Sequence, residues 1–192
     1  MQVQFEKFGF YRINRDYLKY LHSKDSQVFY EATKKYEKKP YLGIIVELGD
    51  MKYCIPLTSA KPRQLNWANI SKHNLIIYEN VYQSELHTND VYKIIGTSNV
   101  YKKILSVLEM RKMIPINDNL CTYIEFDKVG NIPYQNLLEK EYRFLKPLKS
   151  VILKKVTALY NKQKSTGKIE SCYCNFDILE IAYHEYLQNH PK

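Results

Sequence analysis

The spacing of hydrophobic and polar residues changes near residue 130. Before that point, short runs alternate with a period of two or form brief apolar stretches, which is typical of β-strands. After Gly130, apolar residues recur three and four positions apart, as they do in amphipathic helices. We therefore expect one α+β domain over residues 1–192, with a β-rich core over about 1–130 and a helical portion over about 131–192.

The strongest strand signal is a hairpin. Residues 41–48 and 51–57 are rich in β-formers and flank Gly49-Asp50, a pair that tolerates the positive φ of a tight turn. The alternation over residues 3–13 slips once, which predicts a bulged strand. Further short strands are expected at 73–78, 91–95, 104–109 and 113–117. Short strands at such spacing favour a small, curved antiparallel sheet or barrel.

Helix boundaries are marked by asparagine and proline. Asn14 suits the cap of a short helix, and Asn175 suits the cap of a last one. A helix is expected from Pro133 until Pro147 breaks it, and the next extends to about Gly167. The polar stretch 22–39 reads as a mobile loop or a short exposed helix.

Composition narrows the functional classes. The 29 Lys and Arg exceed the 20 Asp and Glu, so the formal charge is +9 and polyanions are favoured as partners. A hydrophobic content of 45% excludes wholesale disorder. No apolar run approaches the roughly 20 residues of a membrane span, and the four cysteines lack paired zinc spacing. We expect a cytoplasmic protein with reduced thiols and neither a metal nor another cofactor.

Much of the positive charge falls in the predicted helices. Between residues 133 and 168 there are nine basic residues, opposed within that segment by only Glu139 and Glu141. The nine are Lys140, Arg143, Lys146, Lys149, Lys154, Lys155, Lys162, Lys164 and Lys168. This imbalance indicates either a solvated helix surface or a face that binds nucleic acid.

Candidate chemistry is concentrated just after the hairpin. Thr58, Ser59 and Lys61 follow its second strand, where a rigid scaffold positions side chains well. By spacing alone, hydroxyls and a lysine at a strand end also fit ordinary turn chemistry. The stretch 165–168 lacks the earlier glycine of a P-loop, and His184-Glu185 lacks the second histidine of a zinc protease.

Several blocks together resemble one known family. The first block is 39–46, the second is Tyr53 with 55–61, and the third is 112–116. The fourth comprises 133–134, 137–138 and 142–144, and the fifth comprises 174–176, 179–180 and 183. In order and spacing these blocks resemble the ToxN and AbiQ endoribonuclease toxins of type III toxin-antitoxin and abortive-infection systems. The resemblance covers most of the chain.

The resemblance implies a β-barrel core like that of the Kid and MazF toxins, elaborated with helices that are mainly C-terminal. It also implies metal-independent RNA cleavage at Thr58, Ser59 and Lys61, with Lys39 before the first hairpin strand. The family's upstream tyrosine falls on Tyr36, one residue out of register. Ala60 stands where some members have proline, and residues 79–103 are longer than in compact members, so no role is transferred to them.

General chemistry agrees with this reading. The ribose 2′-OH can attack the adjacent phosphate, giving a 2′,3′-cyclic phosphate and a 5′-OH end, and a lysine and hydroxyls can stabilise the charge that develops. Lys61 and Ser59 would contact the phosphate, Thr58 would position it, and Lys39 or Tyr36 would assist proton transfer.

The expected partners are RNAs. Cellular and phage RNAs would be substrates, and a repeat-derived antitoxin RNA would be processed, inhibit the toxin and close it into a cyclic oligomer. Candidate RNA contacts are Lys34, Lys35, Arg63, Gln64, Trp67, Lys140, Arg143 and Lys149. Trp67 fits a partly buried core position equally well. The alternatives are a non-catalytic RNA-binding protein and a DNA-binding regulator.

Overall fold

The computed structural model describes residues 3–5, 7–33, 41–96 and 99–191. Four predicted site residues, Lys34, Lys35, Tyr36 and Lys39, lie outside the described residues. The four cysteines are free thiols, as expected. Among the described helices, none is both long and apolar enough to span a bilayer.

The β half forms one antiparallel sheet. Its strands are β1 (Val3–Phe5), β2 (Tyr11–Ile13), β3 (Leu42–Leu48), β4 (Met51–Ser59), β5 (Asn74–Tyr82), β6 (Val91–Ile94), β7 (Val100–Glu109), β8 (Ile114–Ile116) and β9 (Cys121–Tyr123). The main path runs β5-β7-β4-β3-β2-β9, while β1 pairs with β3, β6 with β7 and β8 with β4. The expected hairpin is β3–β4, and the slip expected within 3–13 is the break between β1 and β2, which both pair with β3.

The expected closed barrel is wrong, because the main path of the sheet is open. It begins at β5 and ends at β9, and no pairing among the described strands joins those two edges. Closure requires strands that keep a continuous register around the whole barrel. Here β2, β8 and β9 are three residues each, too short to continue such a register. The likeness to Kid and MazF stays a prediction.

Strand β4 connects the core of the sheet to its outer part. On the edge away from β3, residues 52–54 pair with β8 and residues 57–59 pair with β7. Between those pairings lies Pro56, which has no N–H to donate to a neighbouring strand. The strand therefore leaves the β8 side, continues along β7 and ends at Ser59.

The helices agree with the sequence signals. They are α1 (Arg15–Lys24), α3 (Ile132–Leu145), α4 (Lys149–Thr166) and α5 (Phe176–Asn189). Asn14, Asn131 and Asn175 each accept a backbone N–H in the first turn of their helix, and Gly167 ends α4 with a φ of 63°. The predicted cap positions at Asn14 and Asn175 are confirmed.

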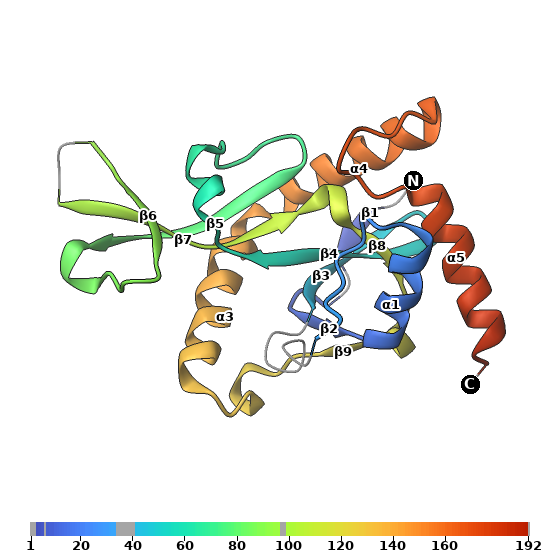
Figure 1. Cartoon of the computed structure of the whole chain (residues 1–192), viewed down its shortest axis with the longest axis horizontal. Coiled ribbons are helices and arrows are strands. Elements are labelled where there is room, and N and C mark those ends of the chain that lie inside the picture. Colours follow the sequence, from blue (N-terminus) through green and yellow to red (C-terminus); the bar gives the residue numbers. More distant parts are fainter. Residues whose placement is uncertain (1–2, 6, 34–40, 97–98, 192) are drawn as a thin grey trace.

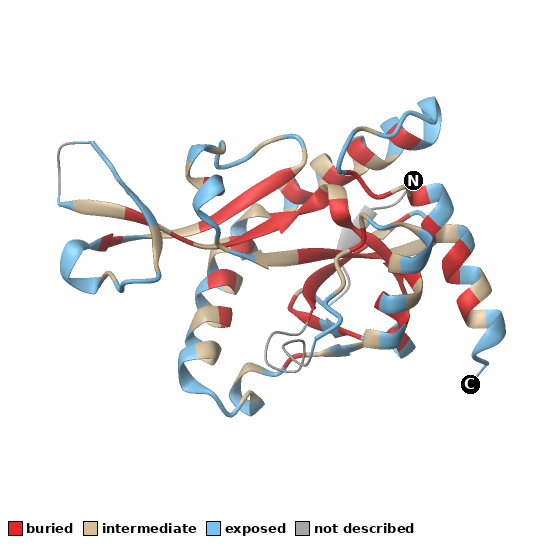
Figure 2. Cartoon of the chain, in the orientation of Figure 1, coloured by how far each residue is buried: buried red, intermediate tan, exposed pale blue. Residues whose placement is uncertain are grey.

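Helices cover the sheet unevenly. Helix α1 packs on α5 and α5 packs on β8, whereas α3 packs against β5 and β7 (Figure 1). Between them the buried residues form a continuous core through β3 and β4 (Figure 2). Tyr17 of α1 is fully buried and donates from its hydroxyl to the Pro115 carbonyl over 2.7 Å. This division leaves α3 facing the outer, β5–β7 part of the sheet.

The outer ends of β5 and β7, together with β6, extend beyond the body of the molecule at the left of Figure 1. This arm falls in the segment 79–103 to which the resemblance assigned no role. Tyr82 is 64% exposed and Ile94 60% exposed, so its surface is partly apolar. The Lys103 ammonium pairs with Asp90 at 2.9 Å at the base of the arm.

Candidate active site

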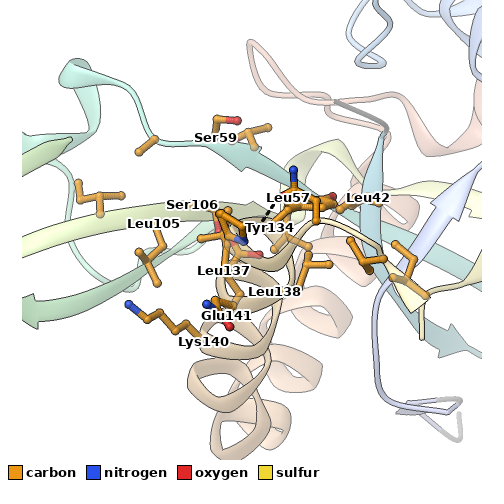
Figure 3. Close-up of a pocket in the computed structure, with 18 of the residues that line it drawn as sticks. Leu42, Leu57, Ser59, Leu105, Ser106, Tyr134, Leu137, Leu138, Lys140 and Glu141 are labelled. Atoms are coloured by element: carbon orange, nitrogen blue, oxygen red, sulfur yellow. Dashed lines mark hydrogen bonds between the residues drawn. The ribbon is translucent and has the colours of Figure 1, made fainter. Parts of the chain in front are cut away.

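A cleft of about 1300 Å³ lies where the end of β4 meets β7 and α3 (Figure 3). One wall comes from residues 57–60 and 103–106, and the opposite wall comes from α3 and from residues 122–125. The cleft is larger than ordinary small-molecule pockets of roughly 300–1,000 Å³. A chain segment of a polymer therefore fits it better than a single metabolite.

Two of the predicted catalytic residues line this cleft. Thr58 and Ser59 are the last residues of β4, opposite Val107 and Ser106 of β7. The Thr58 hydroxyl donates to the Val107 carbonyl over 3.5 Å, which is the weak limit of a hydrogen bond. Ser59 is exposed at the strand end. As consecutive residues of a strand they project to opposite faces of the sheet, so Ser59 shares the face of Ser106 and Thr58 shares that of Val107 at the edge of the cleft.

Lys61 follows in a tightly held turn. The backbone N–H of Lys61 donates to Oε1 of Gln64 over 2.6 Å, and the Gln64 N–H donates back to the Lys61 carbonyl over 2.9 Å. Gln64 is only 1% exposed, whereas Lys61 is exposed. Lys61 is not among the residues that line the cleft. Gln64 fixes the backbone of the turn, and the Lys61 side chain projects into solvent two residues beyond Ser59.

Beside this turn two arginines lie close to one aromatic ring. The guanidinium groups of Arg63 and Arg111 lie 6.0 and 5.8 Å from the centre of the Trp67 ring. Trp67 is half-buried and packs against the small cluster of Ile76, Ile104 and Val107. Trp67 therefore anchors the turn after β4 and still presents part of its ring.

The predicted contacts on the helices have different surroundings. Lys140 lines the cleft and pairs with Glu79 at 2.7 Å. Arg143 pairs with Glu139, one helical turn away, at 3.2 Å. The Lys149 ammonium lies 4.5 Å from the centre of the Phe8 ring, away from the cleft residues. The structure thus brings only Lys140 of these three cations to the cleft.

The basic segment 133–168 is less one-sided in space than in sequence. Lys162 pairs with Glu170, and Lys164 pairs with both Asp177 and Glu180, acids that lie outside the segment. Burial removes Glu141 from the helix surface. A second cavity of about 530 Å³ is lined by Lys154, Lys155 and Lys168 of the segment, together with Lys72 and Lys162, which both pair with Glu170 at its wall.

Sequence reasoning missed two polar residues of the cleft. Glu141 and Ser106 both line it and are each 4% exposed. Burial raises the pKa of Glu141 to about 7, and the neighbouring Ser106 hydroxyl partly opposes that rise. Burial and then Glu141 raise the pKa of Tyr134 to about 12. A signal existed, because Glu141 lies on the apolar stripe of α3, three residues after Leu138.

The described residues contain no group of three or more His, Cys, Asp or Glu side chains arranged to hold a metal ion. Among the histidines, His87 lines the cleft and is exposed at its rim.

Curated relatives of this chain include two proteins named Endoribonuclease ToxN. The protein of Pectobacterium atrosepticum is 28% identical over 178 residues, which are 92% of each chain. The protein of Bacillus thuringiensis subsp. kurstaki is 27% identical over 186 residues, covering 92% of this chain and 83% of the relative.

Solved structures share the fold. A structure from a bacterial antiviral system regulated by a processed non-coding RNA matches with a TM-score of 0.69, at 24% identity over 92% of this chain and 98% of the other. AbiQ, a lactococcal anti-phage endoribonuclease of a type III toxin-antitoxin system, matches with a TM-score of 0.64, at 19% identity over 95% and 99% of the two chains.

The family model described as Toxin ToxN, type III toxin-antitoxin system, matches residues 9–184, which contain the β4 strand end, the cleft and all the described helices up to the last turn of α5. This chain therefore belongs to the ToxN family of type III toxin-antitoxin toxins.

Proposed function

We propose that this protein is a sequence-selective endoribonuclease toxin of a type III toxin-antitoxin system, and that it cleaves RNA without a metal ion. The observation that supports it most is the placement of Thr58 and Ser59 on the cleft, with Lys61 held in a turn two residues later. The curated relatives named as endoribonucleases support the same activity.

In the proposed reaction the ribose 2′-oxygen forms a bond to the adjacent phosphorus while the bond from phosphorus to the 5′-oxygen breaks. The 2′-OH proton leaves to a base, and the departing 5′-oxygen takes a proton from an acid. The products are a 2′,3′-cyclic phosphate and a 5′-OH end. Neither oxidant nor water is consumed, because RNA supplies its own nucleophile.

We assign charge stabilisation to the strand-end group. The Ser59 hydroxyl and the Lys61 ammonium contact the non-bridging oxygens of the phosphate, and Thr58 positions it. Tyr36 and Lys39 carry out proton transfer, with the roles of acid and base still to be divided between them. Removal of one such donor typically lowers the rate by about 10²- to 10³-fold.

RNA on either side of the scissile bond meets the cations nearby. Arg63 and Trp67 contact the flanking nucleotides, and Lys34, Lys35, Lys140, Arg143 and Lys149 contact the backbone. Because the Gln64 amide is engaged with Lys61, we assign Gln64 a positioning role through the turn rather than a contact with RNA.

The proposed partners are cellular and phage RNAs as substrates, and a small antitoxin RNA cut from a repetitive precursor. That RNA occupies the cleft, inhibits the toxin and joins toxin copies into a closed ring. The match to a structure from a bacterial antiviral system that a processed non-coding RNA regulates supports this proposal. Release of the toxin during phage infection would produce abortive infection in the cytoplasm.

The test is cleavage of a mixed-sequence RNA by purified protein in excess chelator. We expect the unmodified protein to cut, and Ser59→Ala and Lys61→Ala to lose about 10²-fold or more of the rate each. Ser150→Ala and Lys19→Ala are matched controls, because both residues are exposed on other helices. Equal cleavage by all five proteins would refute the site assignment.

Binding assays separate the rival functions. A non-catalytic RNA-binding protein would bind the same RNA and leave it intact. A DNA-binding regulator would prefer duplex DNA to single-stranded RNA, and either result in place of cleavage would overturn the proposal.

A further inference from the structure

The interior of the cleft contains polar groups that the proposed reaction does not use. Ser106 lies opposite Ser59 on the neighbouring strand, and its Oγ finds no hydrogen-bond partner among the described residues. Glu141 of α3 lies close enough to Ser106 to be influenced by it and is equally buried. Buried polar groups in proteins are normally satisfied, so an unpaired hydroxyl next to a carboxyl calls for an explanation.

No cation among the described residues pairs with Glu141. The two lysines on the same part of the cleft are already engaged, since Lys140 pairs with Glu79 and Lys103 pairs with Asp90. The ion pairs among the described residues do not include Glu141. A buried carboxyl without an ion pair is costly to a fold, and Glu141 lines the open cleft, where a ligand can reach it and the Ser106 hydroxyl.

The surroundings of this pair suit a planar, partly apolar ligand. Leu57 and Leu105 come from the strands, and Tyr134 and Leu137 come from α3, each half-buried at the wall of the cleft (Figure 3). Single-stranded nucleic acid presents such a ligand, because its bases can leave the stack, lie against aromatic or aliphatic side chains and be read by a few polar groups.

We propose that the Glu141–Ser106 pair is a base-reading subsite next to the scissile phosphate, selective for a nucleobase that carries an exocyclic amino group. The inference rests on the proposed function and adds a specificity determinant to it. A carboxyl accepts a hydrogen bond from an amino N–H in either protonation state, and the Ser106 hydroxyl can donate or accept beside it. Uracil has no exocyclic amino group, and the single N–H on its pairing edge lies between two carbonyls that repel a carboxylate.

The register of the sheet places this subsite close to the reaction. Ser59 and Ser106 are directly paired residues of β4 and β7, so their Cβ atoms lie about 4.5–5.5 Å apart. A nucleotide whose phosphate meets Ser59 can therefore place its own base, or that of the adjacent nucleotide, against Ser106 and Glu141.

The test measures binding of uncleavable mononucleotides, by nuclear magnetic resonance titration at millimolar concentrations. Two pairs of ligands differ at the group in question: adenosine monophosphate against purine riboside monophosphate, and cytidine monophosphate against uridine monophosphate. We expect the amino-bearing member of each pair to bind roughly tenfold more tightly, as a good polar contact to a base edge allows.

Variants then assign the preference to this subsite. Glu141→Gln keeps an acceptor oxygen and should keep the preference, whereas Glu141→Leu should reduce it below about twofold. Glu139→Leu is the matched control, because Glu139 lies on the same helix and is not a cleft residue. Thermal unfolding of each variant checks that the fold is intact.

The outcomes separate this inference from the function on which it rests. Equal affinities within both pairs for the unmodified protein, including no saturable binding by any nucleotide, would overturn the subsite even if RNA is cleaved. A preference that persists in folded Glu141→Leu would overturn it as well. An amino preference that depends on Glu141 in a protein that cuts no RNA would support the subsite and refute the proposed function.

Discussion

Glu141 is buried at a cost to the stability of the fold, and it is also the residue to which we assign the contact with a base. Its carboxyl is 4% exposed, and burial raises its pKa from 4.5 to about 7. It faces the Ser106 hydroxyl and the Tyr134 phenol, while Lys103 and Lys140 on the same walls are paired with other acids. Leucine or methionine would fill this position without the cost of burying a carboxyl, so packing alone does not require glutamate here.

The raised pKa predicts a pH dependence of stability. The folded protein holds the Glu141 proton more tightly than the unfolded chain, so this residue's contribution is fully present below pH 4.5 and is lost as pH rises to about 7. We expect Glu141→Gln to gain up to about 3 kcal/mol over the unmodified protein between those limits. Denaturant unfolding of both proteins across this pH range measures the difference, and a constant difference would contradict the account.

Lys112 has a structural role, which it carries out through hydrogen bonds from its buried ammonium group. It is 6% exposed, burial lowers its pKa, and its ammonium donates to the carbonyl of Gln27 over 3.0 Å and to Oε1 of the same residue over 2.6 Å. These bonds fasten residues 25–33, which lead along the chain toward Tyr36 and Lys39. Lys112 thus links the strand region after β7 to the segment before β3.

We predict that Lys112→Met loosens this segment. Methionine keeps the apolar stem but leaves both oxygens of Gln27 unpaired, which should cost about 1–3 kcal/mol. Hydrogen exchange should accelerate in residues 25–33, whereas Lys24→Met, at an exposed lysine of α1, should leave their exchange unchanged. Unaltered exchange in both variants would show that Lys112 does not fasten the segment.

At the scale of elements, the β3–β4 hairpin depends on one glycine. A Cβ at Gly43 would lie 2.5 Å from the Ile55 carbonyl oxygen, and closer still to Sγ of Cys54. Both neighbours belong to the adjacent strand and are buried. Glycine at this position therefore allows the close approach of two central strands.

Gly43→Ala should accordingly destabilise the protein by about 3 kcal/mol, because the strand must shift to make room. Gly130→Ala is a useful comparison, since a Cβ there meets nothing within 4 Å and only the positive φ of 70° is penalised, at roughly 1 kcal/mol. Chemical denaturation gives both values. A smaller loss at Gly43 than at Gly130 would contradict the packing argument.

The sequence predicted most elements because their signals are local. Asn14 and Asn175 cap helices in the structure as they do in the pattern, and Gly49-Asp50 forms the predicted turn. Strand β9 was missed because Cys121–Tyr123 is short and becomes a strand only through pairing with β2. The pattern left a curved sheet and a barrel as alternatives, because closure depends on non-local pairing, and the barrel implied by the resemblance is the wrong one of the two.

The sequence predicted only the part of the site whose residues are neighbours along the chain. Thr58, Ser59 and Lys61 are contiguous, so the strand end itself predicts them. Glu141 and Ser106 are far apart in sequence and meet only because α3 packs against β7. The environment that raises the pKa of Glu141 is created by that packing, which no local pattern reports.

For the whole molecule, the distribution of charge matters more than its total of +9. Acids outside the basic segment pair with Lys162 and Lys164, and the cleft at the strand end and the second cavity share no lining residue, so their cations belong to separate surfaces. In the proposed function, cations position the RNA backbone and the shape of the cleft provides the selectivity.

The central claim is that RNA supplies the nucleophile and the protein supplies only charge and position. Its most direct test is a pair of oligonucleotides identical except for 2′-deoxyribose at the cleavage position, incubated with the protein in excess chelator. The account predicts cleavage of the ribose form to a 2′,3′-cyclic phosphate and a 5′-OH end, with the deoxy form left intact. Cleavage of the deoxy form, or loss of all cleavage on removing metal ions, would contradict it.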